Sequence, residues 1–307
     1  MNEMGVTIVV PTLNRGEYLI NCLNDLILQK HRPLEILVVD QSKDEKEEVV
    51  RFIKKHEDVI RYNHVSFKGL PEARNYGWQN ARYNAIIYVD DDIRCGNDLV
   101  SEHLRALLLP GVGLVAGGIN EEKVIDDTAY TTGVFSRWTA TPFRGFAARG
   151  EGDVHHAQGV NFSAWRDALI IAGGFDENMN VGAALYEETD CCLRLKRAGF
   201  RAYFNGKARL THLEAGDGGC REHDMHSYAF SLAHNRAILI RRHVRMFQIP
   251  VALMRLAILS LSYSIFYRSP SLLLSFLKGW VRGFRNGRLA PKITIYKRDE
   301  NISSCEK

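Results

Sequence analysis

The chain has 307 residues, of which 46% are hydrophobic and 25% are charged, a composition that is typical of globular proteins and excludes an intrinsically disordered chain. A chain of this length can bury a substantial core, in one large domain with an appendage or in two modest domains. The net charge of +4 is unevenly placed, because 13 of the 40 Lys and Arg residues and no Asp or Glu lie between Arg236 and Arg298. The rest of the chain is therefore net acidic, and the two parts are expected to face different partners.

Segments with the pattern of strands and helices alternate through the first 90 residues. The predicted strands are Val6–Val10, Leu34–Val39, Val59–Val65 and Ala85–Val89, and the predicted helices are Glu17–Gln29, Asp44–His56 and Glu72–Ala81. This alternation predicts an α/β fold built from right-handed βαβ units, with a mostly parallel central sheet and helices on both faces.

The pattern is weaker in the middle of the chain. After an apolar segment at Val112–Gly118, the polar stretch Asn120–Gln158 is expected to be loop-like. Helices are predicted at Ser163–Ala172 and from Glu187 to about Ala198, and a final strand is predicted at Arg201–Phe204.

Three consecutive aspartates, Asp90, Asp91 and Asp92, follow the strand that ends at Val89. Carboxylates this close repel one another unless a cation or strong donors offset their charge. Their oxygens suit Mg²⁺ or Mn²⁺, which often bridge to substrate phosphates. A solvated acidic turn at a helix start is the alternative, but the position at a strand end favours a metal site.

Polar residues also follow two other predicted strands, so three strand ends converge on one crevice. Pro11 and Thr12 end the first strand, and Asp40 ends the second. Asp40 is suited to accept hydrogen bonds from a nucleoside, although a capping or turn aspartate is the alternative. Lys68 and Arg74, around a Gly69 that permits close backbone approach, supply positive charge for a diphosphate, unless they are ordinary surface residues.

These motifs, in this order, resemble family 2 glycosyltransferases with the GT-A fold. The resemblance extends from Val6 to about His212 and rests on PTLNR (11–15), VDQS (39–42), GLPEARN (69–75), VDDD (89–92), GGFD (173–176) and EETDCCLRL (187–195). It implies that Thr12, Arg15 and Asp40 hold the nucleoside and that Arg74 holds the diphosphate. It also implies that Asp90–Asp92 are the DxD metal motif, in which the first acid often contacts the ribose and the last, Asp92, is the preferred ligand.

The resemblance further assigns a general base and a third metal ligand. Family members usually have Glu-Asp where this chain has Glu187-Glu188, so Glu188 is the expected base, with a carboxylate one methylene further out; Glu187 and Asp190 are the fallback candidates. Acids in a first helical turn are otherwise ordinary helix-dipole partners. His212 resembles the family's metal-binding histidine, with a buried, hydrogen-bonded imidazole as the alternative.

The C-terminal region combines basic and apolar residues. Ile249–Tyr267 is apolar over roughly the length that a bilayer requires, but Arg255 near its middle would cost about 2.5–3.5 kcal/mol there. A second apolar segment, Leu272–Trp280, is too short to cross. We expect a helix lying on an anionic membrane surface; a spanning helix, or an appendage packed on the rest of the protein, are the alternatives. Nucleic-acid binding is disfavoured, because no basic and aromatic interleaving is present.

Together these features predict an inverting, metal-dependent glycosyltransferase. Residues 1–235 are expected to form the GT-A catalytic domain and residues 236–307 a membrane-association region. The expected partners are a UDP-, dTDP- or GDP-sugar donor and a glycan or lipid-linked acceptor, in cell-surface polysaccharide synthesis. The six cysteines do not have the spacing of a disulfide framework, and the first residues do not resemble a signal peptide. We therefore expect the protein at the cytoplasmic face of the membrane.

Two other functions compete with this one. The first is a catalytically silent membrane scaffold that has the same fold. This alternative stays open because Glu188 stands where family members usually have the catalytic aspartate. A dinucleotide-binding oxidoreductase is disfavoured, because PTLNR and no GxGxxG follows the first strand.

Overall fold

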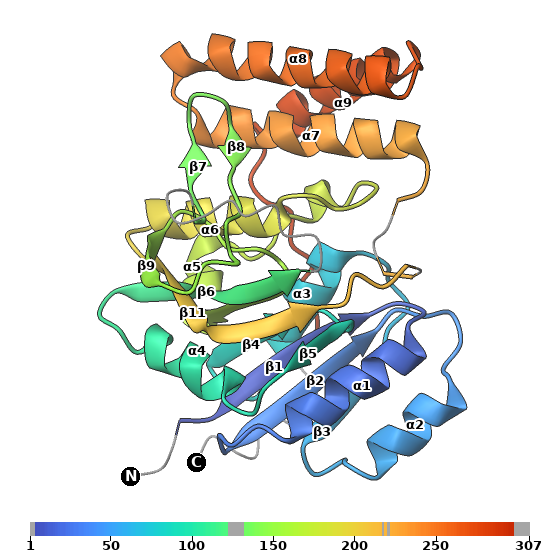
Figure 1. Ribbon diagram of the computed structural model, residues 1–307, viewed down its shortest axis with the longest axis vertical. Coiled ribbons are helices and arrows are strands. Elements are labelled where there is room, and N and C mark those ends of the chain that lie inside the picture. Colours follow the sequence, from blue (N-terminus) through green and yellow to red (C-terminus); the bar gives the residue numbers. More distant parts are fainter. Residues whose placement is uncertain (1–3, 122–131, 217, 220–221, 298–307) are drawn as a thin grey trace.

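The computed structural model describes residues 4–121, 132–216, 218–219 and 222–297. Nine of the strands in this part of the chain form one sheet, with the order β3-β2-β1-β4-β10-β6-β11-β5 and with β9 paired to β11. Helices cover both faces of the sheet, α1, α2 and α4 on one side and α3, α5 and α6 on the other, and a separate helical layer lies above it (Figure 1). The predicted mostly parallel α/β fold is confirmed.

The first four strands are parallel. They are β1 (Val6–Thr12), β2 (Leu34–Asp40), β3 (Ile60–His64) and β4 (Ala85–Val89), joined by α1 (Gly16–Ile27), α2 (Glu47–Lys54) and α3 (Leu70–Asn80). Every residue of β1, β2 and β4 is buried, as expected for parallel strands covered on both faces. Thr12 is in register with Asp40, so the polar strand ends meet at one edge of the sheet.

The other half of the sheet mixes directions. It contains β5 (Ile93–Cys95), β6 (Val112–Glu121), β9 (Glu151–Val154), β10 (Asn161–Trp165) and β11 (Arg201–His212), with α4 (Leu99–Leu107), α5 (Arg166–Ala172) and α6 (Glu187–Arg197). Strand β6 is parallel to β11, whereas β10 is antiparallel to both β4 and β6.

Three sequence expectations fail in this half. The helix predicted from Ser163 begins only at Arg166, because Asn161–Trp165 is a strand whose short apolar run has no decisive period. The stretch expected to be loop-like contains β9 and the hairpin β7 (Phe135–Ser136) and β8 (Thr141–Pro142). The last strand does not stop at Phe204 but continues to His212, with a register shift between Asn205 and Arg209.

Helices α7 (Met225–His243), α8 (Ile249–Phe266) and α9 (Leu272–Asn286) form the helical layer in Figure 1. Asp224 caps α7 by accepting hydrogen bonds from the backbone N–H groups of His226 and Ser227. Helix α9 packs so closely against α7 that a Cβ atom added at Gly283 of α9 would lie 2.2 Å from the carbonyl oxygen of His234 in α7. The expected domain division at 235/236 falls inside α7 and stays a prediction.

The outer side of this layer exposes many large apolar side chains. We call this surface the outer apolar face; its residues are Met254, Ile258, Leu261, Ile265 and Phe266 of α8 and Leu273, Leu274, Leu277 and Val281 of α9. In the described part of the chain, Met246–Phe266 is the one helical segment long and apolar enough to cross a membrane. Only 22% of its most apolar 18-residue stretch is buried against the rest of the protein. A helix so little covered has an apolar surface that none of the described residues covers.

Candidate active site

An acidic cluster lies at the carboxyl edge of the sheet. Asp90 and Asp92 follow β4, and His212 reaches them because the end of β11 pairs antiparallel with β5, with His212 opposite Ile93. One ligand atom from each of Asp90, Asp92 and His212 lies within 4.8 Å of the others. The structure thus brings together the three residues that the sequence predicts as metal ligands.

The cluster has the chemistry that a divalent cation requires. Asp92 Oδ1 is buried without a hydrogen-bond donor of good geometry, and its ion-pair neighbour is His212 Nε2 at 3.3 Å. A buried carboxylate oxygen left in this way is costly unless a cation completes its surroundings. Two carboxylates and one imidazole suit Mn²⁺ or Mg²⁺, so the residues present fit the predicted ion.

Arg15 and Thr12 hold the aspartates from the other side. Arg15 Nη1 lies 3.0 Å from Asp91 Oδ1 and 3.0 Å from Asp92 Oδ2, and the Thr12 hydroxyl donates a 2.6 Å hydrogen bond to Asp91. Burial raises the pKa of Asp91 to about 6, against the opposing effect of Arg15 and Thr12. Burial acts in the same direction on Asp92, but His212 and Arg15 outweigh it and lower the pKa of Asp92.

Two connected cavities open beside this cluster. The larger, of about 540 Å³, is lined by Pro11, Thr12, Arg15 and all three aspartates. The smaller, of about 170 Å³, is lined by Arg74, Gln158 and Glu188. Both are bounded by Leu70, Asp90, Arg144, Ala183, Leu185 and His212, so the acidic cluster stands at their junction.

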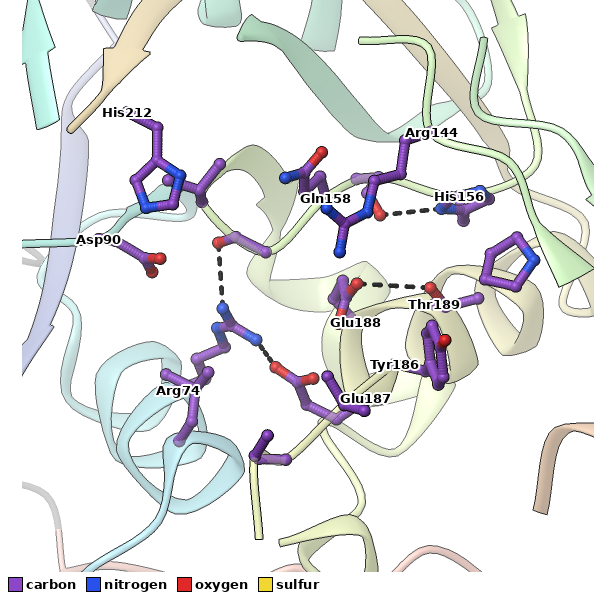
Figure 2. A pocket seen from close by; sticks show the side chains of 18 residues that line it. Arg74, Asp90, Arg144, His156, Gln158, Tyr186, Glu187, Glu188, Thr189 and His212 are labelled. Carbon is purple, nitrogen blue, oxygen red and sulfur yellow. Dashed lines mark hydrogen bonds and ion pairs between the residues drawn. The ribbon is translucent and has the colours of Figure 1, made fainter. Parts of the chain in front are cut away.

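Glu188 faces the smaller cavity from the first turn of α6 (Figure 2). Its carboxylate is half-buried and accepts a 3.4 Å hydrogen bond from the Thr189 hydroxyl. Tyr186, just before the helix, has a left-handed backbone with φ 69°, which is rare for an aromatic residue and determines where α6 begins. The carboxylate of Glu188 is therefore accessible within the same cleft as the acidic cluster.

Arg74 does not reach the larger cavity, which changes the expected role of two residues. The Arg74 side chain is 2% exposed and forms an ion pair with Glu187, also 2% exposed; its Nη2 donates a 3.0 Å hydrogen bond to the Gly159 carbonyl. The Arg74 charge is thus already neutralised, and the Glu187 carboxylate is held by that charge. Arg74 fits poorly as the main diphosphate contact, and Glu187 fits poorly as a base.

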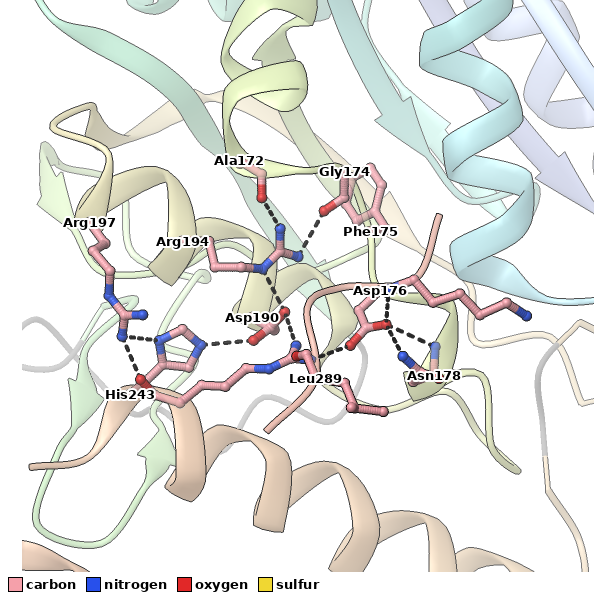
Figure 3. A network of polar contacts seen from close by, with 12 residues as sticks. Ala172, Gly174, Phe175, Asp176, Asn178, Asp190, Arg194, Arg197, His243 and Leu289 are labelled. Atoms are coloured by element: carbon pink, nitrogen blue, oxygen red, sulfur yellow. Dashed lines mark hydrogen bonds and ion pairs between the residues drawn. The ribbon is translucent and has the colours of Figure 1, made fainter. Parts of the chain in front are cut away.

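Asp190 is not positioned to act as a base. Its side chain is completely buried and lines neither cavity, and it forms ion pairs with Arg194 at 2.8 Å, Arg242 at 3.0 Å and His243 at 2.8 Å (Figure 3). Burial alone would raise the pKa of Asp190, but Arg194, His243 and Arg242 together hold it well below its usual range. Asp190 therefore fastens α6 to the end of α7.

Asp40 and Lys68 lie outside the two cavities. Asp40 is buried and accepts 2.8 Å hydrogen bonds from the Tyr62 hydroxyl and the Ser42 N–H, while its neighbour Gln41 lines the larger cavity. Lys68 is exposed. Their expected contacts with a nucleotide stay predictions. Gln41, to which the sequence analysis gave no role, is the polar side chain of this segment that lines the larger cavity.

Arg144 is a second residue that the sequence did not single out. It follows β8, lines both cavities and points between Gln158 and Glu188 in Figure 2. No motif marks it, because it lies in the stretch that was expected to be loop-like.

Comparisons with known proteins identify the family of this chain. The model of the family "Glycosyl transferase family 2" matches residues 7–170, more than half of the chain. A glucosyl-dolichyl phosphate glucuronosyltransferase of Haloferax volcanii is 24% identical over 68% of this chain and 69% of its own length. A pre-mycofactocin glycosyltransferase of Mycobacterium tuberculosis is 26% identical over 67% of this chain but only 42% of its own length.

Solved structures share the fold. A mannosyltransferase of Pyrobaculum calidifontis, determined with GDP-Man and Mn²⁺, superposes with a TM-score of 0.58 at 16% identity, covering 92% of this chain and 86% of that one. GalNAc-T7, determined with UDP, GalNAc and Mn²⁺, also gives 0.58, at 14% identity, covering 87% of this chain and 59% of that one. By its sequence and its architecture, this chain belongs to glycosyl transferase family 2 and has the GT-A fold.

Proposed function

We propose that the protein is an inverting, metal-dependent glycosyltransferase that moves a sugar from a nucleotide diphosphate sugar to a hydroxyl group of its acceptor. The observation that carries the proposal is the position of the acidic cluster between two connected cavities, one lined by Thr12 and Arg15 and the other by Glu188. The larger cavity is suited to the donor and the smaller to the acceptor. The Mn²⁺ in two structures of the same fold supports a metal.

In the proposed reaction, Glu188 takes the proton of the acceptor hydroxyl. The acceptor oxygen then bonds to the anomeric carbon while the bond to the diphosphate breaks on the opposite face, so the configuration inverts. The diphosphate leaves with the bonding electrons, and Arg15 keeps Asp91 and Asp92 in place beside it. A divalent ion held by Asp90, Asp92 and His212 would neutralise the charge on the leaving group.

We further propose a lipid-linked or glycan acceptor and attachment to the cytoplasmic face of a membrane, in cell-surface polysaccharide synthesis. The outer apolar face of α8 and α9 supports attachment, as does the acid-free, basic sequence from Arg236 to Lys297. Arg255 in α8 favours a helix lying on the membrane over one crossing it. The dolichyl phosphate in the name of the Haloferax relative supports a lipid-linked acceptor.

Nucleotide-dependent stabilisation tests the donor and the metal. We expect one of UDP-, GDP- or dTDP-sugar to raise the melting temperature only when Mn²⁺ or Mg²⁺ is present, because a ligand that binds the folded state stabilises it by mass action. Asp92→Ala should abolish that increase, whereas exchange of the exposed Glu48 for Gln should leave it intact. A metal-independent response would contradict the proposed ion.

Glu188→Gln tests the base separately. The variant should keep nucleotide binding but lose about 10²- to 10⁴-fold in kcat, the usual contribution of general-base catalysis. Full transfer activity in this variant would rule Glu188 out as the base. If the unaltered protein binds nucleotide but shows neither sugar transfer nor slow hydrolysis of the donor, it is instead a catalytically silent scaffold.

A further inference from the structure

Arg144 brings to the junction of the two cavities a positive charge that no described residue neutralises. Its side chain makes no hydrogen bond or ion pair with any residue in the described parts of the chain. In Figure 2 its guanidinium points into the smaller cavity, toward the space between Gln158 and Glu188. Within the described ranges, Arg144 and Glu188 are not within ion-pair distance of each other, so Glu188 does not neutralise Arg144.

The other two arginines that line the cavities are already engaged. Arg15 contacts Asp91, Asp92 and the Gly218 carbonyl, and Arg74 is paired with Glu187. A guanidinium presents planar donors that match the oxygens of a phosphate or carboxylate in a bidentate way. An oxyanion of the substrate is therefore the chemistry that fits Arg144.

The position of Arg144 favours the acceptor as the source of that oxyanion. The acceptor hydroxyl must come within hydrogen-bond distance of Glu188, and Arg144 points into the same small cavity. On the donor side, Arg15 and the acidic cluster already provide the groups that a cation and a diphosphate need. A group that lies between Gln158 and Glu188 is on the acceptor side of the cleft.

The hairpin β7–β8 links this cleft to the helical layer of α7 and α8. Arg144 lies just beyond its second strand, and the tip carries Trp138, which is 52% exposed and packs edge-to-face against Phe247 at 5.8 Å. Arg236 of α7 donates hydrogen bonds to the Thr139 carbonyl and the Thr141 hydroxyl, which fixes the hairpin to the helical layer. Figure 1 shows the hairpin rising from the sheet to α7 and α8. An anionic head at Arg144 and an apolar chain at Trp138 and Phe247 would contact the base and the tip of the same hairpin.

We propose that Arg144 binds a phosphate group of a lipid-linked acceptor and holds the acceptor beside Glu188. This inference rests on the proposed function, since it assigns the substrate class of the acceptor side of the same cleft. It makes Arg144, at the junction of the two cavities, a determinant of acceptor specificity rather than of donor binding.

Binding of farnesyl phosphate and farnesol in detergent micelles tests the proposal, because these probes share the apolar chain and differ in the phosphate. The unaltered protein should bind farnesyl phosphate at least about 10-fold more tightly than farnesol. Arg144→Ala should remove that preference and leave farnesol binding unchanged, and Arg144→Lys should restore only part of it, because Lys lacks the planar fork. Arg149→Ala is the matched control, since Arg149 is exposed five positions away and lines neither cavity.

The same variants are measured for binding of UDP, GDP and dTDP with Mn²⁺. Unchanged nucleotide affinity in Arg144→Ala supports the proposal. Loss of nucleotide affinity with farnesyl phosphate binding intact would assign Arg144 to the donor diphosphate and overturn it, as would equal binding of farnesyl phosphate and farnesol by the unaltered protein. A protein that binds farnesyl phosphate through Arg144 but binds no nucleotide would overturn the proposed function and leave the anion site standing.

Discussion

Removing the charge of Asp190 should weaken the attachment of α6 to the C-terminal helices. In Asp190→Asn the side chain keeps its size, but Arg194, Arg242 and His243 lose the carboxylate that they share. Breaking a buried ion pair by changing one partner typically costs about 3–5 kcal/mol. Arg194 keeps its hydrogen bonds to the Ala172 and Gly174 carbonyls, and Arg242 keeps Asp176.

Because Arg194 and Arg242 keep these other partners, we expect a decrease in the free energy of unfolding of about 3 kcal/mol, at the lower end of that range. Urea unfolding at pH 7, followed by circular dichroism, measures it. Asp153→Asn is the control: Asp153 also pairs with an arginine, Arg201, but the pair is exposed and should be worth no more than about 1 kcal/mol.

The pH dependence gives an independent check. The folded-state pKa of Asp190 is lowered, so its contribution to stability is complete above the unfolded-state pKa, about 3.9, and is lost as the pH falls below it. The stability difference between the unaltered protein and Asp190→Asn should therefore be constant near neutrality and shrink below about pH 4. A variant that is as stable as the unaltered protein at pH 7, yet has no transfer activity, would refute this reasoning and make Asp190 a candidate base again.

Three further predictions concern packing, the membrane and the metal. Gly283→Ala should destabilise the protein by about 1–3 kcal/mol in urea unfolding, because its Cβ would lie 2.2 Å from the His234 carbonyl, whereas Gly152→Ala, with open space around it, should be nearly neutral. Leu261→Glu combined with Ile265→Glu should reduce co-sedimentation with anionic vesicles while leaving the melting temperature within a few degrees; undiminished sedimentation would argue against the outer apolar face as the contact. EDTA should abolish transfer, and Mn²⁺ or Mg²⁺ should restore it; activity that persists in EDTA would exclude the acidic cluster as an essential metal site.

Local sequence determined the N-terminal half of the fold and most of the cleft. Val6–Val10, Leu34–Val39 and Ala85–Val89 are short apolar runs between helical patterns, and such runs become buried parallel strands because both of their faces must be covered. Residues at the carboxyl ends of parallel strands lie along one edge of the sheet, so the alternation of strands and helices already places Thr12 and the three aspartates on the same edge. The pairing of β1 with β4 then makes them neighbours. The membrane-association region and its boundary stay predictions.

Tertiary structure decided which charges are available. The pattern of residues did not reveal that Arg74 is neutralised by Glu187, 113 positions later, or that Asp190 is held by Arg242 and His243 from another helix. Likewise, His212 reaches Asp92 only because β11 continues beyond its predicted end and pairs with β5. Burial and periodicity are local properties that a short stretch of sequence encodes, whereas the partner of a buried charge depends on how distant elements pack. For the same reason, only the packing of the hairpin beside Glu188 identifies Arg144 as a cation that no described residue neutralises.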